Sequence, residues 1–199
     1  MAAATQTVDL AQHPEARISP IKFGMMVFIG SETMFFAALF GAYYTLRAQS
    51  PEWPPAEAAP MLALTLPVAV TIILFISSWT MGFALLAHRR NNPKWIVIWL
   101  LVTIFLAGIF LLAKAYEMWT AEVGVSDAAY GTIYEVLLGF HGLHMIAGIT
   151  MMVVVISRVG FGAYQTGLPK SAGLEATGYY WHFVDLIWLG VFTTIWLMK

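Results

Sequence analysis

Residues 95–113 read WIVIWLLVTIFLAGIFLLA, a run of 19 residues that is apolar apart from Thr103. The hydrocarbon core of a bilayer needs about 20 such residues, because a helix rises about 1.5 Å per residue. This stretch therefore predicts a transmembrane helix. Comparable stretches occupy four other parts of the chain, which are residues 23–46, 62–87, 133–156 and 177–198. The fold class we expect is all-α, an integral membrane bundle of five transmembrane helices.

The composition agrees with a protein that has lipid as its solvent. Of the 199 residues, 60% are hydrophobic and only 11% are charged, with a mean hydropathy of +0.75. Soluble domains carry roughly 25% charged residues, so a water-soluble enzyme and a disordered tail are excluded. Ten Lys and Arg against eleven Asp and Glu leave no basic excess for nucleic acid. The absence of Cys excludes disulfides, iron–sulfur clusters, covalent c-type haem and thiolate copper centres.

The distribution of Lys and Arg predicts the orientation, because cytoplasmic loops carry an excess of these residues. With the N-terminus inside, seven of the ten fall on the inner side, namely Arg17, Lys22, Arg89, Arg90, Lys94, Arg158 and Lys170. The outer side holds Arg47, Lys114 and Lys199. We therefore expect the N-terminus inside and the C-terminus outside. Residues 1–21 would form a cytoplasmic segment, and residues 22–199 a single five-helix transmembrane domain.

Three ionisable side chains near the middle of the membrane predict a polar cluster. Each costs at least about 2.5 kcal/mol in hydrocarbon. Glu32 lies near the midplane of the first span, and His144 lies at a similar depth in the fourth. His141 is three residues earlier, on the same helical face. Since a hydrogen bond would offset the cost of burying both partners, we expect Glu32 to face the bundle and to bond His141 or His144.

Two functional interpretations of this cluster stay open beside a purely structural one. In the first, the carboxylate and the imidazoles form a proton relay. In the second, His141, His144 and His182 are axial ligands of b-type haem, although His182 lies nearer the inner face than His144.

Further polar residues occupy the last span and the inner helix ends. His182 and Asp185 are three residues apart, so they can bond along one face of the helix as an interhelical polar contact. A metal site is the alternative, but it would need three or four donors. The inner positions of Arg158, Arg89 and Arg90 predict contacts with lipid headgroups, against ordinary positive-inside charge as the alternative.

Three strings of residues carry a family resemblance. They are Ser31–Ala37 (SETMFFA), Gly139–Gly148 (GFHGLHMIAG) and Glu175–Asp185 (EATGYYWHFVD). In order and spacing they resemble the signatures of subunit III of the haem–copper terminal oxidases. The second contains the Phe-His-Gly-x-His motif and the third the Trp-His-Phe-Val-Asp motif. The similarity extends over roughly residues 19–198.

The resemblance implies a non-redox subunit of a proton-pumping respiratory oxidase such as cytochrome c oxidase. It implies no catalytic residue, metal, haem or copper in this chain, since those centres belong to the partner subunits I and II. Such a subunit packs against the catalytic subunit I, supports proton uptake and binds phospholipid. Glu32 matches the family's carbodiimide-reactive intramembrane carboxylate, and Arg158 falls near a residue that contacts lipid headgroups.

The number of predicted spans indicates the kind of organism from which the protein comes. The mitochondrial form has seven, and the two absent here are its first two, so five spans imply a bacterial protein of the plasma membrane. Three alternatives stay open: subunit III of a quinol oxidase, a haem-b membrane anchor passing electrons to quinone, and a small transporter.

Overall fold

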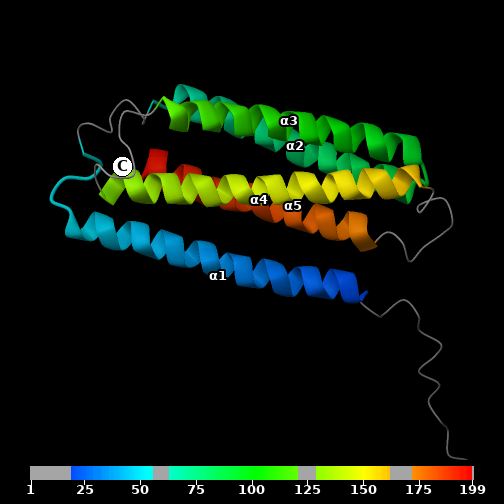
Figure 1. The fold of residues 1–199 in the computed structure, drawn as a ribbon, viewed down its shortest axis with the longest axis horizontal. Coiled ribbons are helices and arrows are strands. Elements are labelled where there is room, and N and C mark those ends of the chain that lie inside the picture. Colours follow the sequence, from blue (N-terminus) through cyan, green and yellow to red (C-terminus); the bar gives the residue numbers. More distant parts are fainter. Residues whose placement is uncertain (1–18, 56–62, 121–128, 162–171, 199) are drawn as a thin grey trace, which may run out of the picture.

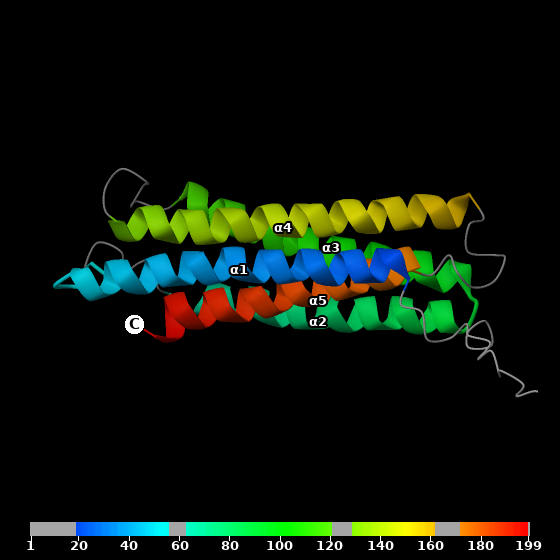
Figure 2. The ribbon, with the colours of Figure 1, turned by 90° about the horizontal axis from the view of Figure 1, so that it is seen from below.

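The computed structural model describes residues 19–55, 63–120, 129–161 and 172–198, and these residues form helices with short irregular segments at their ends and contain no strand. The helices are α1 (Pro20–Gln49), α2 (Thr65–Arg89), α3 (Pro93–Trp119), α4 (Ala129–Gly160) and α5 (Ala172–Phe192), which continues into the π-helical segment η4 (Thr193–Leu197). They lie side by side along one axis (Figures 1 and 2). Within these described ranges, five helices are long and apolar enough to cross a membrane. The predicted five-helix membrane class is confirmed.

The helices extend beyond the predicted apolar stretches because local capping sets their ends. Ser19 precedes Pro20, and its side chain accepts a hydrogen bond from the backbone N–H of Lys22 at 3.3 Å. Asn92 caps the start of α3 in the same way, before Pro93. Asn91 has a φ of 50°, a left-handed conformation that Asn tolerates. This turn brings α2 and α3 together as antiparallel neighbours.

Helix α5 is the central element of the bundle. It packs against α1, α2 and α4, while α3 packs against α2 and α4. Figure 2 shows α5 between α1 and α2. By contrast, α1 buries only Phe36 and Tyr43. Most of the surface of α1 is therefore left for lipid or for another chain.

Close packing between α4 and α5 depends on a glycine. A Cβ atom added at Gly148 would lie 2.8 Å from Cε3 of Trp181, closer than real Cβ contacts allow. Small residues of this kind let helices approach in membranes, where dispersion contacts rather than hydrophobic exclusion hold them together. Gly148 therefore fixes the α4–α5 distance at the level of a fully buried tryptophan.

The first and last described helices show how the chain runs through the bundle. α1 begins at one end of the bundle and η4 finishes at the other (Figure 1). Which end is inside stays a prediction from the Lys and Arg distribution. Within that distribution, Arg17, Lys170 and Lys199 lie outside the described residues, as does most of the segment predicted over residues 1–21.

Candidate functional site

A hydrogen-bonded carboxylate–imidazole pair joins α1 to α4 near the middle of both helices. Nε2 of His144 lies 2.8 Å from Oε2 of Glu32, and Nδ1 of His144 lies 2.7 Å from the carbonyl oxygen of Phe140. The side chains of Glu32 and His144 are 21% and 14% exposed. The expected contact between Glu32 and the His face of α4 is thus present, through His144.

The second contact of His144 constrains the protonation of the pair. A carbonyl oxygen only accepts, so Nδ1 must carry the proton that it donates to Phe140. Nε2 then either accepts from a protonated Glu32 or, in an imidazolium, donates to the Glu32 carboxylate. Both states have zero net charge, which limits the cost of placing the two groups in a membrane.

Aromatic rings enclose the His144 imidazole, and they come from the strings singled out in the sequence. The ring of Phe36 meets it edge-on at a centroid distance of 4.9 Å, and Phe35 stacks at 6.2 Å. From α5, the Tyr180 hydroxyl donates to the His144 carbonyl oxygen at 3.1 Å. The three family-like strings therefore converge on one place in the bundle.

His141 does not belong to the cluster, contrary to the expectation that grouped it with Glu32 and His144. Its side chain is buried among Phe110 and Trp188, with ring centroids 5.8 and 5.2 Å away. Neither ring nitrogen has a hydrogen-bond partner among the described residues. Positions three apart differ by about 60° around a helix, which is enough to turn His141 toward α3 and α5.

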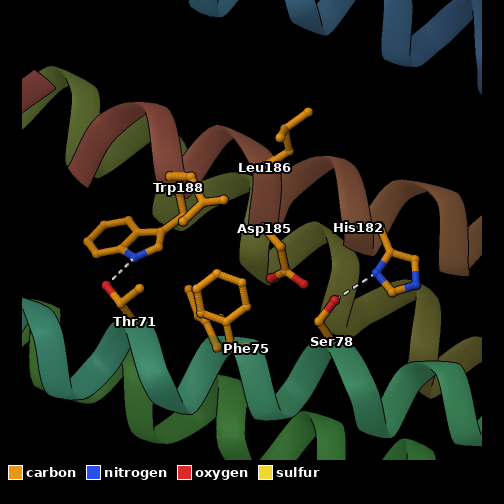
Figure 3. A pocket seen from close by; sticks show the side chains of 9 residues that line it. Thr71, Phe75, Ser78, His182, Asp185, Leu186 and Trp188 are labelled. Atoms are coloured by element: carbon orange, nitrogen blue, oxygen red, sulfur yellow. Dashed lines mark hydrogen bonds between the residues drawn. The ribbon is translucent and has the colours of Figure 1, made fainter. Parts of the chain in front are cut away.

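The expected bond between His182 and Asp185 is also absent. Nδ1 of His182 instead lies 2.8 Å from the Ser78 hydroxyl on α2 (Figure 3). Both carboxyl oxygens of Asp185 are buried without a hydrogen-bond partner in the described part of the chain. The described residues hold no group of three His, Asp or Glu side chains placed to bind a metal ion.

A buried ion pair near the end of α3 was not predicted from the sequence. Lys114, taken above as an outer charge beyond the third span, lies inside the bundle with 7% of its side chain exposed. Its Nζ donates to Oε2 of Glu117 at 2.6 Å, and Tyr134 donates to Oε1 of the same carboxylate at 3.0 Å. Nζ also lies 4.4 Å from the ring centroid of Trp196 and 5.1 Å from that of Trp188. The i, i+3 spacing of Lys and Glu was the one available signal.

The three arginines predicted to contact lipid lie at helix ends and are exposed. Arg89 is the last residue of α2, Arg90 follows it, and Arg158 lies in the last turn of α4. Arg90 also lines a cavity of about 390 Å³, together with residues that include Asn92, Trp95 and Trp99. A guanidinium beside indole rings at a helix end is typical of the membrane interface.

Together these features define a class of protein, a polytopic membrane subunit with an intramembrane carboxylate–imidazole pair. The family model described as cytochrome c oxidase subunit III matches residues 3–199. The chain belongs to the cytochrome c oxidase subunit III family. Membership makes it a multi-pass membrane protein and a subunit of an oxidase complex.

Individual relatives carry the same name over most of the chain. A probable cytochrome c oxidase subunit 3 of Nocardia farcinica is 32% identical over 191 residues, covering 94% of this chain and 92% of the relative. Cytochrome c oxidase subunit 3 of Synechocystis sp. is 34% identical over 186 residues, covering 94% and 77%. The protein of that name from Papio hamadryas is 37% identical over 180 residues, covering 88% and 68%.

Proposed function

We propose that this chain is a non-redox subunit of a proton-pumping cytochrome c oxidase in a bacterial plasma membrane. Its role is to stabilise the catalytic subunit I, to support proton uptake and to bind lipid. The observation that carries the proposal is the Glu32–His144 hydrogen bond, which holds the least buried helix, α1, to the rest of the bundle. A helix with so much free surface suits contact with a partner.

Polar contacts fix α1 at three levels. They are an ion pair from Lys22 to Glu175, the Glu32–His144 pair, and hydrogen bonds from Tyr43 to the Thr194 carbonyl and from Arg47 to the Met198 carbonyl. The Lys22 ion pair and the hydrogen bonds of Tyr43 and Arg47 lie toward opposite ends of α1. The Glu32–His144 pair between them therefore resists bowing of the helix. We propose that a fixed α1 keeps the catalytic subunit and its proton entrance in their working geometry.

The redox centres are proposed to lie in partner subunits I and II. Two of the three imidazoles considered above as haem ligands already bond protein groups, His144 to Glu32 and His182 to Ser78. The third, His141, is enclosed by aromatic side chains. This arrangement favours the oxidase proposal over a haem-b anchor. The names of the relatives favour cytochrome c over quinol as the electron donor of the complex.

Lipid binding is proposed at the helix ends that carry Arg89, Arg90 and Arg158. A phosphate can accept charge-assisted hydrogen bonds from a guanidinium, and the cavity beside Arg90 gives room for one headgroup. Native mass spectrometry of the complex tests this. Arg90→Gln should reduce the number of phospholipids retained, whereas Lys94→Gln, an exposed matched control at the start of α3, should not. Equal retention in both variants would refute a specific site.

Substitution of Glu32 tests the stabilising role. Glu32→Ala removes the bond to His144, so we expect subunit III to be lost more easily from the purified complex and activity to decay sooner during turnover. The haem spectrum should not change. Glu32→Gln retains an amide donor for Nε2 and should behave more like the unsubstituted chain. Thr33→Ala is the neighbouring control, because the Thr33 hydroxyl donates to the Ile29 carbonyl oxygen within α1 itself. Normal assembly and endurance in Glu32→Ala would contradict the proposal.

A further inference from the structure

The cavity of about 390 Å³ beside the turn that joins α2 to α3 has two ends of different polarity. Arg90 and Asn92 line it at the turn, whereas Phe83 and Trp99 line it on the two helices. Phe83 lies seven residues before Arg90 and Trp99 seven residues after Asn92, which is a depth of about 10 Å at the rise of a helix. The α2–α3 cavity is therefore polar at the membrane surface and apolar toward the hydrocarbon.

Aromatic contacts hold the apolar wall of the α2–α3 cavity in place. The ring centroid of Phe83 lies 4.9 Å from that of Trp99, and Trp95 stacks on Trp99 at 6.2 Å. The wall stays open to the outside, because Phe83, Leu86 and Trp95 are 44%, 41% and 47% exposed. At this depth an acyl chain can cover the wall and gain dispersion contacts with the rings.

The polar end of the cavity presents hydrogen-bond donors. Oδ1 of Asn92 accepts from the backbone N–H of Trp95 at 3.5 Å as the cap of α3, so the NH₂ group of the same amide stays available to donate. The guanidinium of Arg90 carries donors only, and none of the ion pairs between described residues includes it. A phosphate diester supplies the acceptor oxygens and the negative charge that match these two groups.

The charges around the turn favour an anionic headgroup over a zwitterionic one. Three exposed basic residues lie there, Arg89, Arg90 and Lys94, and residues 58–116 contain no Asp or Glu. The Glu175 carboxylate, at the start of α5, is already in an ion pair. The ammonium group of a zwitterionic headgroup would therefore lie among basic side chains without a carboxylate to bind, whereas a headgroup with a net negative charge meets only attraction.

We propose that the α2–α3 cavity binds one anionic phospholipid, with its phosphate on Arg90 and Asn92 and one acyl chain along Phe83 and Trp99. The inference rests on the proposed function, because lipid binding is part of that function; it adds the charge of the headgroup and the place of the acyl chain. The attraction of one Arg to an anionic headgroup corresponds to about a fivefold preference, so phosphatidylglycerol should bind about fivefold more tightly than phosphatidylethanolamine.

Native mass spectrometry of the intact complex, released from nanodiscs of equal parts phosphatidylglycerol and phosphatidylethanolamine, tests the headgroup. Arg90→Gln should retain one phosphatidylglycerol fewer than the unsubstituted complex and as much phosphatidylethanolamine. Lys94→Gln removes a charge that does not line the cavity and should change neither count.

An unchanged phosphatidylglycerol count in Arg90→Gln, or an equal loss in Lys94→Gln, would overturn the inference. Equal loss of both lipids from Arg90→Gln would overturn the anionic class but leave the proposed lipid-binding role standing. Purification of the chain without any redox-active subunit would instead contradict the proposed function.

A bulkier side chain in the apolar part of the cavity tests the place of the acyl chain. Leu86 lines that part and is 41% exposed, so the indole of Leu86→Trp should fill the cavity without disturbing the core, and the same phosphatidylglycerol should be lost. Leu101→Trp is the control, because Leu101 is 53% exposed and lies two residues beyond Trp99, on the opposite side of α3. Retention of the lipid in Leu86→Trp, its loss from Leu101→Trp, or its displacement by inorganic phosphate would overturn the inference, the last by showing a site for a phosphate group alone.

Discussion

The Lys114–Glu117 ion pair gives the sharpest prediction about stability. Lys114 donates to Glu117 at 2.6 Å, and the two side chains are only 7% and 13% exposed. Lys114→Met removes the charge but retains an unbranched side chain of similar length, so little cavity is created. What remains is a buried carboxylate whose one described hydrogen bond comes from Tyr134.

The size of the effect follows from this burial. Removing one member of a buried ion pair costs about 3–5 kcal/mol, because the other charge is left uncompensated. The contacts of Nζ with the rings of Trp188 and Trp196 add about 0.5–2 kcal/mol. We therefore expect Lys114→Met to lower the free energy of unfolding by at least about 3 kcal/mol, a factor of more than 100 in the folded-to-unfolded ratio.

The control is the other Lys–Glu pair between described residues, from Lys22 to Glu175, where each side chain is 29% exposed. Partly exposed pairs contribute about 0–1 kcal/mol, so Lys22→Met should cost far less. Both variants are compared by SDS titration of the chain in maltoside micelles, with tryptophan fluorescence as the signal. The double variant Lys114→Met/Glu117→Met should regain most of the loss, because no unpaired charge is left. Equal costs at Lys114 and Lys22, or a double variant weaker than Lys114→Met, would refute the reasoning.

Two further predictions concern buried positions of α4. His141→Leu should leave the unfolding free energy unchanged or raise it, because an unpaired buried imidazole is replaced by an apolar side chain; a loss above about 1 kcal/mol in the same titration would contradict this. Gly148→Ala should cost about 1–3 kcal/mol through overpacking against Trp181. Gly139→Ala, where a Cβ atom has no neighbour within 4 Å, is the matched control and should be close to neutral.

The spans were predictable because hydrocarbon thickness sets the length of an apolar run independently of packing. All five predicted stretches fall within or close to the observed helices, whose extra turns come from caps such as Ser19 and Asn92. The Glu32–His144 bond was predictable as well, since matching depth and the cost of burial single out these two groups. Depth along the membrane normal can be counted from the sequence.

The direction in which a side chain points around its helix axis cannot be counted in the same way. The wrong predictions concern this direction. His141 and His144 have nearly the same depth, but only the packing of α3 and α5 determines that His141 faces Trp188. His182 bonds Ser78 across the helices rather than its helical neighbour Asp185. Lys114 was counted only as a charge on the outer side of the membrane, whereas its packing within the bundle, where Glu117 pairs with it, could not be counted from the sequence.

The most direct test of the oxidase assignment is purification of the chain from its native membrane in mild detergent. The co-purifying chains would be identified, and haem and copper assigned to each subunit. We expect a haem–copper catalytic subunit in equal amount, with all haem and copper bound to the partner chains and none to this one. Purification of this chain alone with its own haem absorption band, or without any oxidase subunit, would contradict the assignment.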